Sequence, residues 1–317
     1  MTIKQIFDLA IKMGIKSDFR PKVQIEKQLK RIEEKYKKLD KSEKEIFDAE
    51  KLTNPYSDSR IQFDNGNKNI KKVMAGIDID TAEIMLAEEL DIDMVIGHHP
   101  LGMGLACLDD VMQLQADVFA KYGVPINIAE SLTKIKISEV SRGVGAENHY
   151  KTSNAAKLLK IGLMNLHTPA DNLVAKFVDR KLKKDKPEYV EDVIKSLLEI
   201  PEYKEAAKKG FGPTIFSGAK ENRVGRIALT EITGGTSGSK DIYEKLSQAG
   251  IGTIVGMHMD EESRKNAEKF HINVVIAGHI SSDSLGMNLF LDELEKRSIE
   301  IIPCSGLIRI SRNKKKK

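Results

Sequence analysis

Short apolar runs in this sequence repeatedly end at histidine. Five of the seven histidines directly follow such a run: His98, His99, His167, His258 and His279. The runs have the length and β-branched content of buried strands, and helical patterns separate them. Strands that alternate with helices indicate βαβ units and a largely parallel sheet, whose carboxyl ends share one edge. The sequence therefore predicts an α/β fold with imidazoles at the edge where open α/β sheets bind ligands.

The same patterns divide the chain into an N-terminal helical extension, a first α/β lobe, a helical connecting region, a second α/β lobe and a basic tail. The expected boundaries are 1–53, 54–171, 172–225, 226–310 and 311–317. Within the first lobe, a helix at residues 109–121 is expected to lead into a strand at 125–129. Because strands end in histidine in both lobes, we expect two similar halves that face one cleft.

The N-terminal extension is rich in Lys and Glu and carries one apolar stripe at helical spacing. Its members are Leu29, Ile32, Tyr36 and Leu39. Ser42 and Glu45 have the spacing of a capping box. The stripe fits either packing on the main body or an oligomer contact, and packing on the body is the favoured interpretation.

Charge and cysteine usage narrow the function classes. The formal net charge is +4, and removing Lys314–Lys317 leaves a body with no formal net charge. A neutral body argues against nucleic acid, which requires concentrated positive charge. Cys107 and Cys304 are isolated and form no CxxC, so neither a disulfide framework nor a thiolate zinc site is expected. We therefore predict a reducing, cytoplasmic setting, with neither a signal peptide nor a membrane span of roughly 20 apolar residues.

The polar residues after the strands have the spacing of a metal site. His98 and His99 are adjacent, so in an extended chain their side chains point to opposite sides and suit two ions better than one. Asp171 follows His167 by four residues and Asp283 follows the last histidine of the set by four, so one helical turn would align each pair. Imidazoles and carboxylates without thiolates suit Zn, Mn, Fe, Co or Ni. Two such ions form a hydrolytic arrangement.

Each residue also has a structural interpretation. A single histidine after a strand is more often a surface or capping residue, and this applies to His258 and His149 taken alone. His271 lies in a helix-to-strand turn and is interpreted as structural. Asp283 could act only as a helix N-cap. The three histidine motifs together nevertheless favour a shared metal site.

These motifs resemble a known family. Gly97-His-His-Pro100, His167-Thr-Pro-Ala-Asp171 and Gly278-His-Ile-Ser-Ser-Asp283 are similar to the signature of the Nif-three-like family. Its members are described as dinuclear metal-centre proteins and are often labelled GTP cyclohydrolase type-2-like. The resemblance runs from about Asn54 to Arg309, so the N-terminal extension lies outside the family's usual short form. It implies two interlocked α/β lobes, a cleft with two divalent ions per chain and, in many members, a ring-shaped hexamer.

The resemblance also implies the metal ligands. His98 and His99 would each bind one ion, and Asp171 and His279 match further ligands. The last ligand of the family is usually a bridging Glu, and Asp283 occupies that position here with a side chain one methylene shorter.

Residues around the ions are candidates for proton transfer or for orienting the ligands. The catalytic candidates are His167, His258 and Glu147, and His149 and Glu130 are further possibilities. The glycine-rich segment 233–239 fits either a phosphate-binding loop at a helix start or an ordinary glycine turn. It matches neither the P-loop nor the dinucleotide fingerprint.

The leading hypothesis is a dinuclear-metal hydrolase that acts on a small phosphorylated or nucleotide-like substrate and forms a homo-oligomer. The alternative is a non-catalytic metal carrier or regulatory scaffold that uses the same ligands. A catalytic site must keep an open coordination position and a nearby base, whereas a storage site need not.

Overall fold

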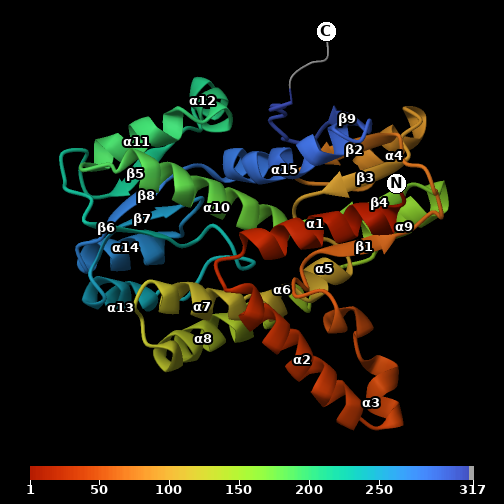
Figure 1. Ribbon diagram of the computed structural model, residues 1–317, viewed down its shortest axis with the longest axis horizontal. Helices are drawn as coiled ribbons and strands as arrows, with labels where there is room; N and C mark the ends of the chain where they lie inside the picture. The colour runs from red at the N-terminus through yellow and green to blue at the C-terminus, as the bar shows by residue number, and fades with distance from the viewer. Residues whose placement is uncertain (314–317) are drawn as a thin grey trace.

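Two small sheets, each with one antiparallel edge strand, form the frame of the protein. The computed structural model describes residues 1–313 (Figure 1). In spatial order the first sheet contains β1 (Arg60–Phe63), β4 (Gly162–Asn165), β3 (Met94–Gly97), β2 (Lys72–Gly76) and β9 (Glu300–Pro303). The second contains β5 (Thr214–Ser217), β8 (Asn273–Ile276), β7 (Ile251–Gly256) and β6 (Arg226–Leu229). Apart from the antiparallel pairs β1–β4 and β5–β8, all neighbours are parallel, which confirms the predicted α/β class.

The register of the parallel strands brings their carboxyl ends level. In the first sheet Gly76 pairs with Gly97, and Gly97 pairs with Asn165. In the second sheet Gly256 pairs with Ile276. β3, β4 and β8 are buried at every residue, because helices or loops cover both of their faces. The histidine-bearing segments therefore leave each sheet at one edge, and the two edges face each other.

Within residues 1–313, fifteen α-helices and one 3-10 helix accompany the sheets. Those in the first half of the chain are α1 (Ile3–Ser17), α2 (Lys22–Lys38), α3 (Lys41–Ile46), η1 (Ala49–Leu52), α4 (Thr81–Glu89), α5 (Met103–Ala106), α6 (Leu108–Val111), α7 (Gln113–Lys121), α8 (Ile126–Val144) and α9 (Lys151–Leu159). The others are α10 (Thr168–Asp185), α11 (Val190–Leu198), α12 (Pro201–Lys208), α13 (Ile242–Gln248), α14 (Glu261–Lys269) and α15 (His279–Glu295). None in the described range is long and apolar enough to cross a bilayer.

Two helices, α10 and α15, lie between the sheets and connect the lobes (Figure 1). α10 starts after the first sheet's β4, and α15 starts after the second sheet's β8. They pack closely because Gly286 of α15 has no side chain. A Cβ there would meet the carbonyl oxygen of Ala170 and approach its carbonyl carbon to 2.9 Å. Ala170 immediately precedes Asp171, so this contact sets the spacing between the two helix starts.

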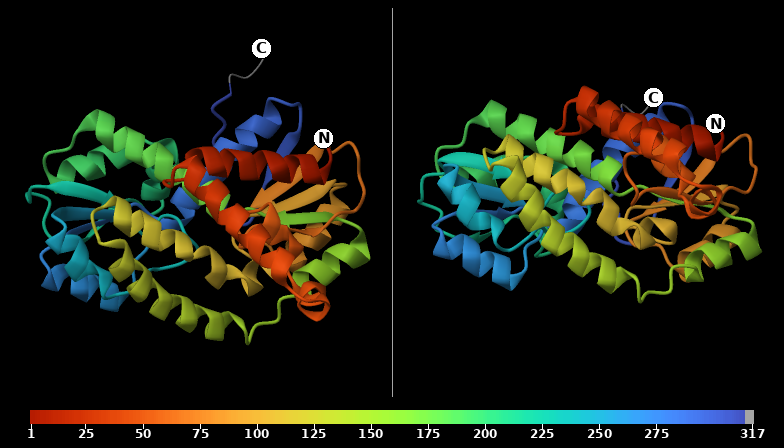
Figure 2. Two further views of the ribbon diagram at one scale, coloured as in Figure 1. Left: turned by 60° about the horizontal axis from the view of Figure 1, so that its bottom comes forward. Right: turned by 90° about the horizontal axis from the view of Figure 1, so that it is seen from below.

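The lobes are interlocked by a helical excursion between β3 and β4. After β3 the chain leaves the first sheet, and its helices α7 and α8 pack against the second lobe before the chain returns to β4 (Figure 2). The backbone N–H of Leu229 on β6 donates to the hydroxyl of Tyr122 at 3.0 Å. The amide of Gln115 donates to the carbonyl of Gly234 at 2.9 Å. One buried apolar cluster consequently includes residues from both lobes.

The strand predicted at residues 125–129 is wrong, because this segment begins α8. Pro125 lies at the N-cap and has φ −55°, which suits the entry to a helix. The apolar residues Ile126, Ile128 and Ala129 fit a short strand as well as one helix turn, and only Ala129 among them is fully buried. The short edge strands β1 and β5 were not expected from the sequence.

The N-terminal segment packs on the body through α1 and projects from it through α2 and α3 (Figure 1). α1 lies along α10, where a Cβ on Gly14 would be 2.9 Å from the Cα of Pro169. The apolar stripe on α2 is only half-buried. The capping box before α3 is formed by Asp40 and Glu43, which corrects the expectation of Ser42 and Glu45, because the helix begins at Lys41. The Lys run of the predicted tail, 314–317, lies outside the described residues.

We expect Gly286→Ala to destabilise the protein although alanine favours helices. The new methyl group must separate α10 from α15, which typically costs about 1–3 kcal/mol. Gly143→Ala on α8 is the matched control, because a Cβ there meets no atom within 4 Å. The control should stabilise by roughly 0.5–1 kcal/mol. Urea unfolding of both variants measures the difference, and equal stabilisation by both would contradict the account of this contact.

Candidate metal centre

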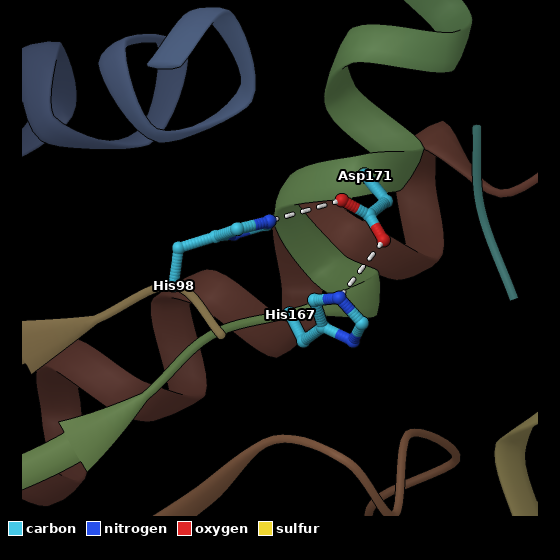
Figure 3. A group of neighbouring side chains, drawn as sticks. All are labelled: His98, His167 and Asp171. Carbon is cyan, nitrogen blue, oxygen red and sulfur yellow. Dashed lines mark ion pairs between the residues drawn. The ribbon is translucent and has the colours of Figure 1, made fainter. Parts of the chain in front are cut away.

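An inner group of side chains comes together where β3 and β4 end. His98 follows β3, and His167 is the N-cap residue of α10, after β4. Asp171 lies one turn into α10, so its carboxylate returns toward both imidazoles (Figure 3). His98 Nε2 is 3.4 Å from Asp171 Oδ1, and His167 Nε2 is 3.8 Å from Asp171 Oδ2. All three side chains are buried, and their ligand atoms could hold one ion.

An outer group lies beside it, centred on Asp283. The Oδ2 atom of Asp283 is 3.4 Å from His99 Nε2 and 3.6 Å from His279 Nε2. Its Oδ1 atom is 3.4 Å from His98 Nε2, which belongs to the inner group. His98, His99 and Asp283 could hold a second ion. The side chain of His279 is 43% exposed, whereas that of Asp283 is fully buried, so the outer group opens toward solvent.

α15 begins at His279, which places Asp283 inside the helix rather than at its N-cap. The N-cap is Gly278, with φ 111°, a conformation that glycine adopts readily. The capping interpretation of Asp283 is therefore wrong. One helical turn separates Asp283 from His279, as the four-residue spacing indicated.

The residues present fit a metal centre. His98 Nε2, Asp171 Oδ1 and both carboxylate oxygens of Asp283 are buried without a hydrogen-bond partner. Buried polar atoms are normally paired, since each unsatisfied one costs about 1–3 kcal/mol. The distances of 3.4–3.8 Å between imidazole nitrogens and carboxylate oxygens are longer than a good hydrogen bond. They approach the spacing of about 3–3.5 Å between donors that share an ion at about 2.1 Å.

Each imidazole in the two groups except that of His279 is oriented by a hydrogen bond at its other nitrogen. His98 Nδ1 lies 3.0 Å from the carbonyl of Leu166, which can only accept, so this nitrogen carries the proton and Nε2 is left as the donor to a metal. His99 Nδ1 contacts Asp78 Oδ1 at 2.6 Å, and His167 Nδ1 contacts Asp58 Oδ2 at 2.8 Å. Carboxylate or carbonyl partners of this kind fix the tautomer of metal-binding histidines.

Charge and burial shift the pKa values of the two carboxylates in opposite directions. Burial, with the neighbouring Asp283 and Asp58, raises the pKa of Asp171 well above its usual value. Burial acts on Asp283 in the same sense, but the surrounding imidazoles outweigh it and hold the pKa of Asp283 below its usual value. Burial also opposes the charged form of His99, yet Asp283 and Asp78 raise its pKa to about 9. A divalent cation would favour the ionised carboxylates and the neutral imidazoles together.

A cavity of about 190 Å³ lies against both groups, between the lobes. His258, on the loop after β7, lines it, and burial lowers the pKa of this imidazole to about 4. The segment 233–239 contributes Thr233, Gly235 and Thr236 to the wall. This segment leads to α13, which starts only at Ile242, so its backbone does not form a helix N-terminus.

Glu231 also lines this cavity and was not found from the sequence. It has φ 56°, unusual for a residue other than glycine, and both its carboxylate oxygens accept from the N–H of Gly238, at 3.2 and 3.1 Å. Burial raises its pKa to about 7. No sequence motif includes this residue, because only the folding of the second lobe brings it to the cavity.

Other sequence candidates lie elsewhere. Glu147 is exposed on the loop before α9 and does not line the central cavity. Glu130 is exposed on α8 and lines a separate hollow. His149 is part of a neighbouring hollow that also includes His99. His271 is exposed in the turn before β8 with φ 58°, in line with its structural interpretation.

Comparisons with known proteins connect this geometry to a family. The family model described as Duf34/NIF3 (NGG1p interacting factor 3) matches residues 12–121. The match starts within α1, so part of the N-terminal segment belongs to the family pattern, contrary to the expectation that the family begins near Asn54. No match is found among curated proteins.

The chain is similar to solved structures, one of which shares its fold over almost the whole length. A NIF3 superfamily protein from Sphaerobacter thermophilus is 24% identical, with 97% of this chain and 99% of that chain covered and a TM-score of 0.77. Reduced HcgD from Methanocaldococcus jannaschii is 19% identical, with 77% and 87% covered and a TM-score of 0.46. The chain is therefore similar to the Duf34/NIF3 family over residues 12–121, and it shares the fold of the Sphaerobacter thermophilus protein over almost its whole length.

Proposed function

We propose that this protein binds two divalent transition-metal ions and hydrolyses a small phosphorylated or nucleotide-like substrate. The observation that carries the proposal is the set of buried, unpartnered donor atoms on His98, Asp171 and Asp283. Two carboxylates and several imidazoles without a thiolate suit Zn, Fe, Mn, Co or Ni. The family resemblance further suggests that this activity is GTP cyclohydrolase type-2-like.

The proposed ligands divide between two ions. His98, Asp171 and Asp283 Oδ1 would hold the inner ion, with His167 as a further ligand. His99, His279 and Asp283 Oδ2 would hold the outer ion. Asp283 would therefore bridge the ions, since its two oxygens face different imidazoles. When bound, paired ions about 3.5–4 Å apart activate water and stabilise charge on a reacting oxygen.

Side chains around the small cavity would handle the proton and position the substrate. His258 is neutral near pH 7 because its pKa is low, so it can accept a proton. Its Nδ1 lies 3.2 Å from the hydroxyl of Ser237, a group that can donate or accept, so either ring nitrogen can be the accepting atom. The cavity wall at Thr236 offers a hydroxyl to a phosphoryl oxygen, whereas the hydroxyl of Thr233 donates to Asn172. We assign no role to Glu147.

A non-catalytic metal carrier or regulatory scaffold is the second candidate. Its support is the depth of the inner group, where His98 and Asp171 are almost inaccessible. The small volume of the adjoining cavity also suits retention of an ion better than access of a substrate.

The family resemblance further implies assembly into a homo-oligomer, in many members a hexamer, and we propose the same here. The half-buried stripe on the projecting α2 is available for such a contact. A cytoplasmic location, with no membrane or nucleic-acid partner, is also proposed, from the isolated cysteines and the neutral body.

Asp283→Asn should weaken binding of at least one ion by more than the ~10–100-fold typical of residues that only support ligands. The reason is that a neutral amide donates poorly to a divalent cation, and this carboxylate faces three imidazoles. Asp283→Glu should retain binding, because it restores the family's usual ligand. Calorimetric titration of Mn²⁺ or Zn²⁺ into metal-free protein measures both. Unchanged affinity in the Asn variant would remove Asp283 from the site.

Metal-loaded protein should hydrolyse members of a panel of phosphate esters and nucleotides, whereas metal-free protein should not. His99→Asn should abolish turnover because it removes a ligand from the solvent-facing group. His271→Asn is the matched control, since the same replacement falls on an exposed turn and Asn tolerates a positive φ. Phosphate or nucleoside release measures the activity. Two bound ions without turnover on any substrate would favour the carrier.

A further inference from the structure

A second, larger cavity opens beside the metal centre. Its volume is about 570 Å³, which falls in the range of small-molecule binding sites. It lies between the end of α12, the edge strand β5, the start of α15 and the C-terminal segment. Its wall is mainly apolar, and the principal side chains are Phe211, Phe216, Met257, Met259, Ile276 and Ile280.

The fold leaves these side chains open instead of packing them. Phe211 is 73% exposed, Phe216 is 38% exposed and Ile280 is 37% exposed. β5 is an edge strand in which Thr214 pairs with Ile276, and its register shifts between Ile215 and Ser217. Both Thr214 and Phe216 line the cavity. Gly278 has no Cβ, and one there would contact the carbonyl oxygen of Phe211 at 3.0 Å. The cavity is therefore built from exposed phenyl rings and bare backbone.

The two cavities are joined at their walls. His258, His279 and Met257 line both the small metal-facing cavity and the large apolar one. A molecule whose anionic group reaches the outer imidazoles can therefore place its remaining part against Phe216. Apart from the histidines, Lys209 is the charged residue among those that line the large cavity. The interior thus favours an uncharged group.

We propose that the large cavity binds an aromatic ring of the molecule whose anionic group is held at the metal centre. The proposal rests on the proposed function and deepens it, because it restricts the substrate class to anions that carry an apolar ring. Rings are favoured over flexible chains because Phe211 and Phe216 offer aromatic faces and edges, and aromatic pairs gain beyond their buried area.

The test compares methylphosphonate with benzylphosphonate on metal-reconstituted protein by isothermal titration calorimetry. Both probes carry the same anionic group, and only benzylphosphonate carries a ring. The expected result is about tenfold or more tighter binding of benzylphosphonate, as burial of a ring predicts. Phe216→Ser should remove most of this difference and leave the affinity for methylphosphonate unchanged. Leu158→Ser on α9, where the leucine is 82% exposed, is the control and should preserve the difference.

Equal affinities of the two probes on metal-loaded wild-type protein would overturn the inference and leave the proposed function intact. Equal weakening of both probes by Phe216→Ser would also overturn it. Elemental analysis of the same samples distinguishes failure of this inference from failure of the proposed function. Protein that retains no metal would overturn the proposed function and this inference with it. A smaller particle mass for Phe216→Ser in light scattering would show that a second copy covers the cavity, which also contradicts the proposal.

Discussion

The close packing of α10 against α15 is the contact on which the candidate site depends. Gly286 allows the backbone of α15 to reach Ala170, and Asp171 and Asp283 consequently project into one buried space. Two buried carboxylates repel each other and lose their hydration, so this arrangement is unfavourable unless positive charge lies between them. The imidazole of His98, 3.4 Å from both, supplies part of that charge only when it is protonated. Bound cations would supply it without a proton.

Side-chain burial decreases from the inner group of the site to the outer group. His98 and Asp171 are inaccessible, whereas His279 and the neighbouring apolar cavity face solvent. An ion at the inner group would therefore be shielded from solvent, and one at the outer group would be open to it. Asp283 belongs to both, because one oxygen faces the inner imidazole and the other faces the outer pair. The open outer group suits the proposed hydrolytic centre, and the buried inner group suits the alternative, a metal carrier.

The sequence predicted the parts of the site that are encoded locally. Strand-terminal histidines and the four-residue spacings to Asp171 and Asp283 depend only on strand ends and helical turns. Asp58, which fixes the ring of His167 from 109 residues away, and Glu231 carry no local pattern. The strand prediction for 125–129 failed for a related reason. A short apolar run beside a proline fits either a strand or the start of a helix, and tertiary contacts determine which one forms. The antiparallel edge strands were missed because four residues give too little periodicity.

Anomalous X-ray diffraction from crystals of zinc- or manganese-loaded protein tests the central claim most directly. The proposed ligand arrangement predicts two anomalous peaks per chain, about 3.5–4 Å apart, with the carboxylate of Asp283 between them. One peak should lie against His98 and Asp171, and the other against His99 and His279. A single peak, or two peaks that leave Asp283 uncoordinated, would contradict the account.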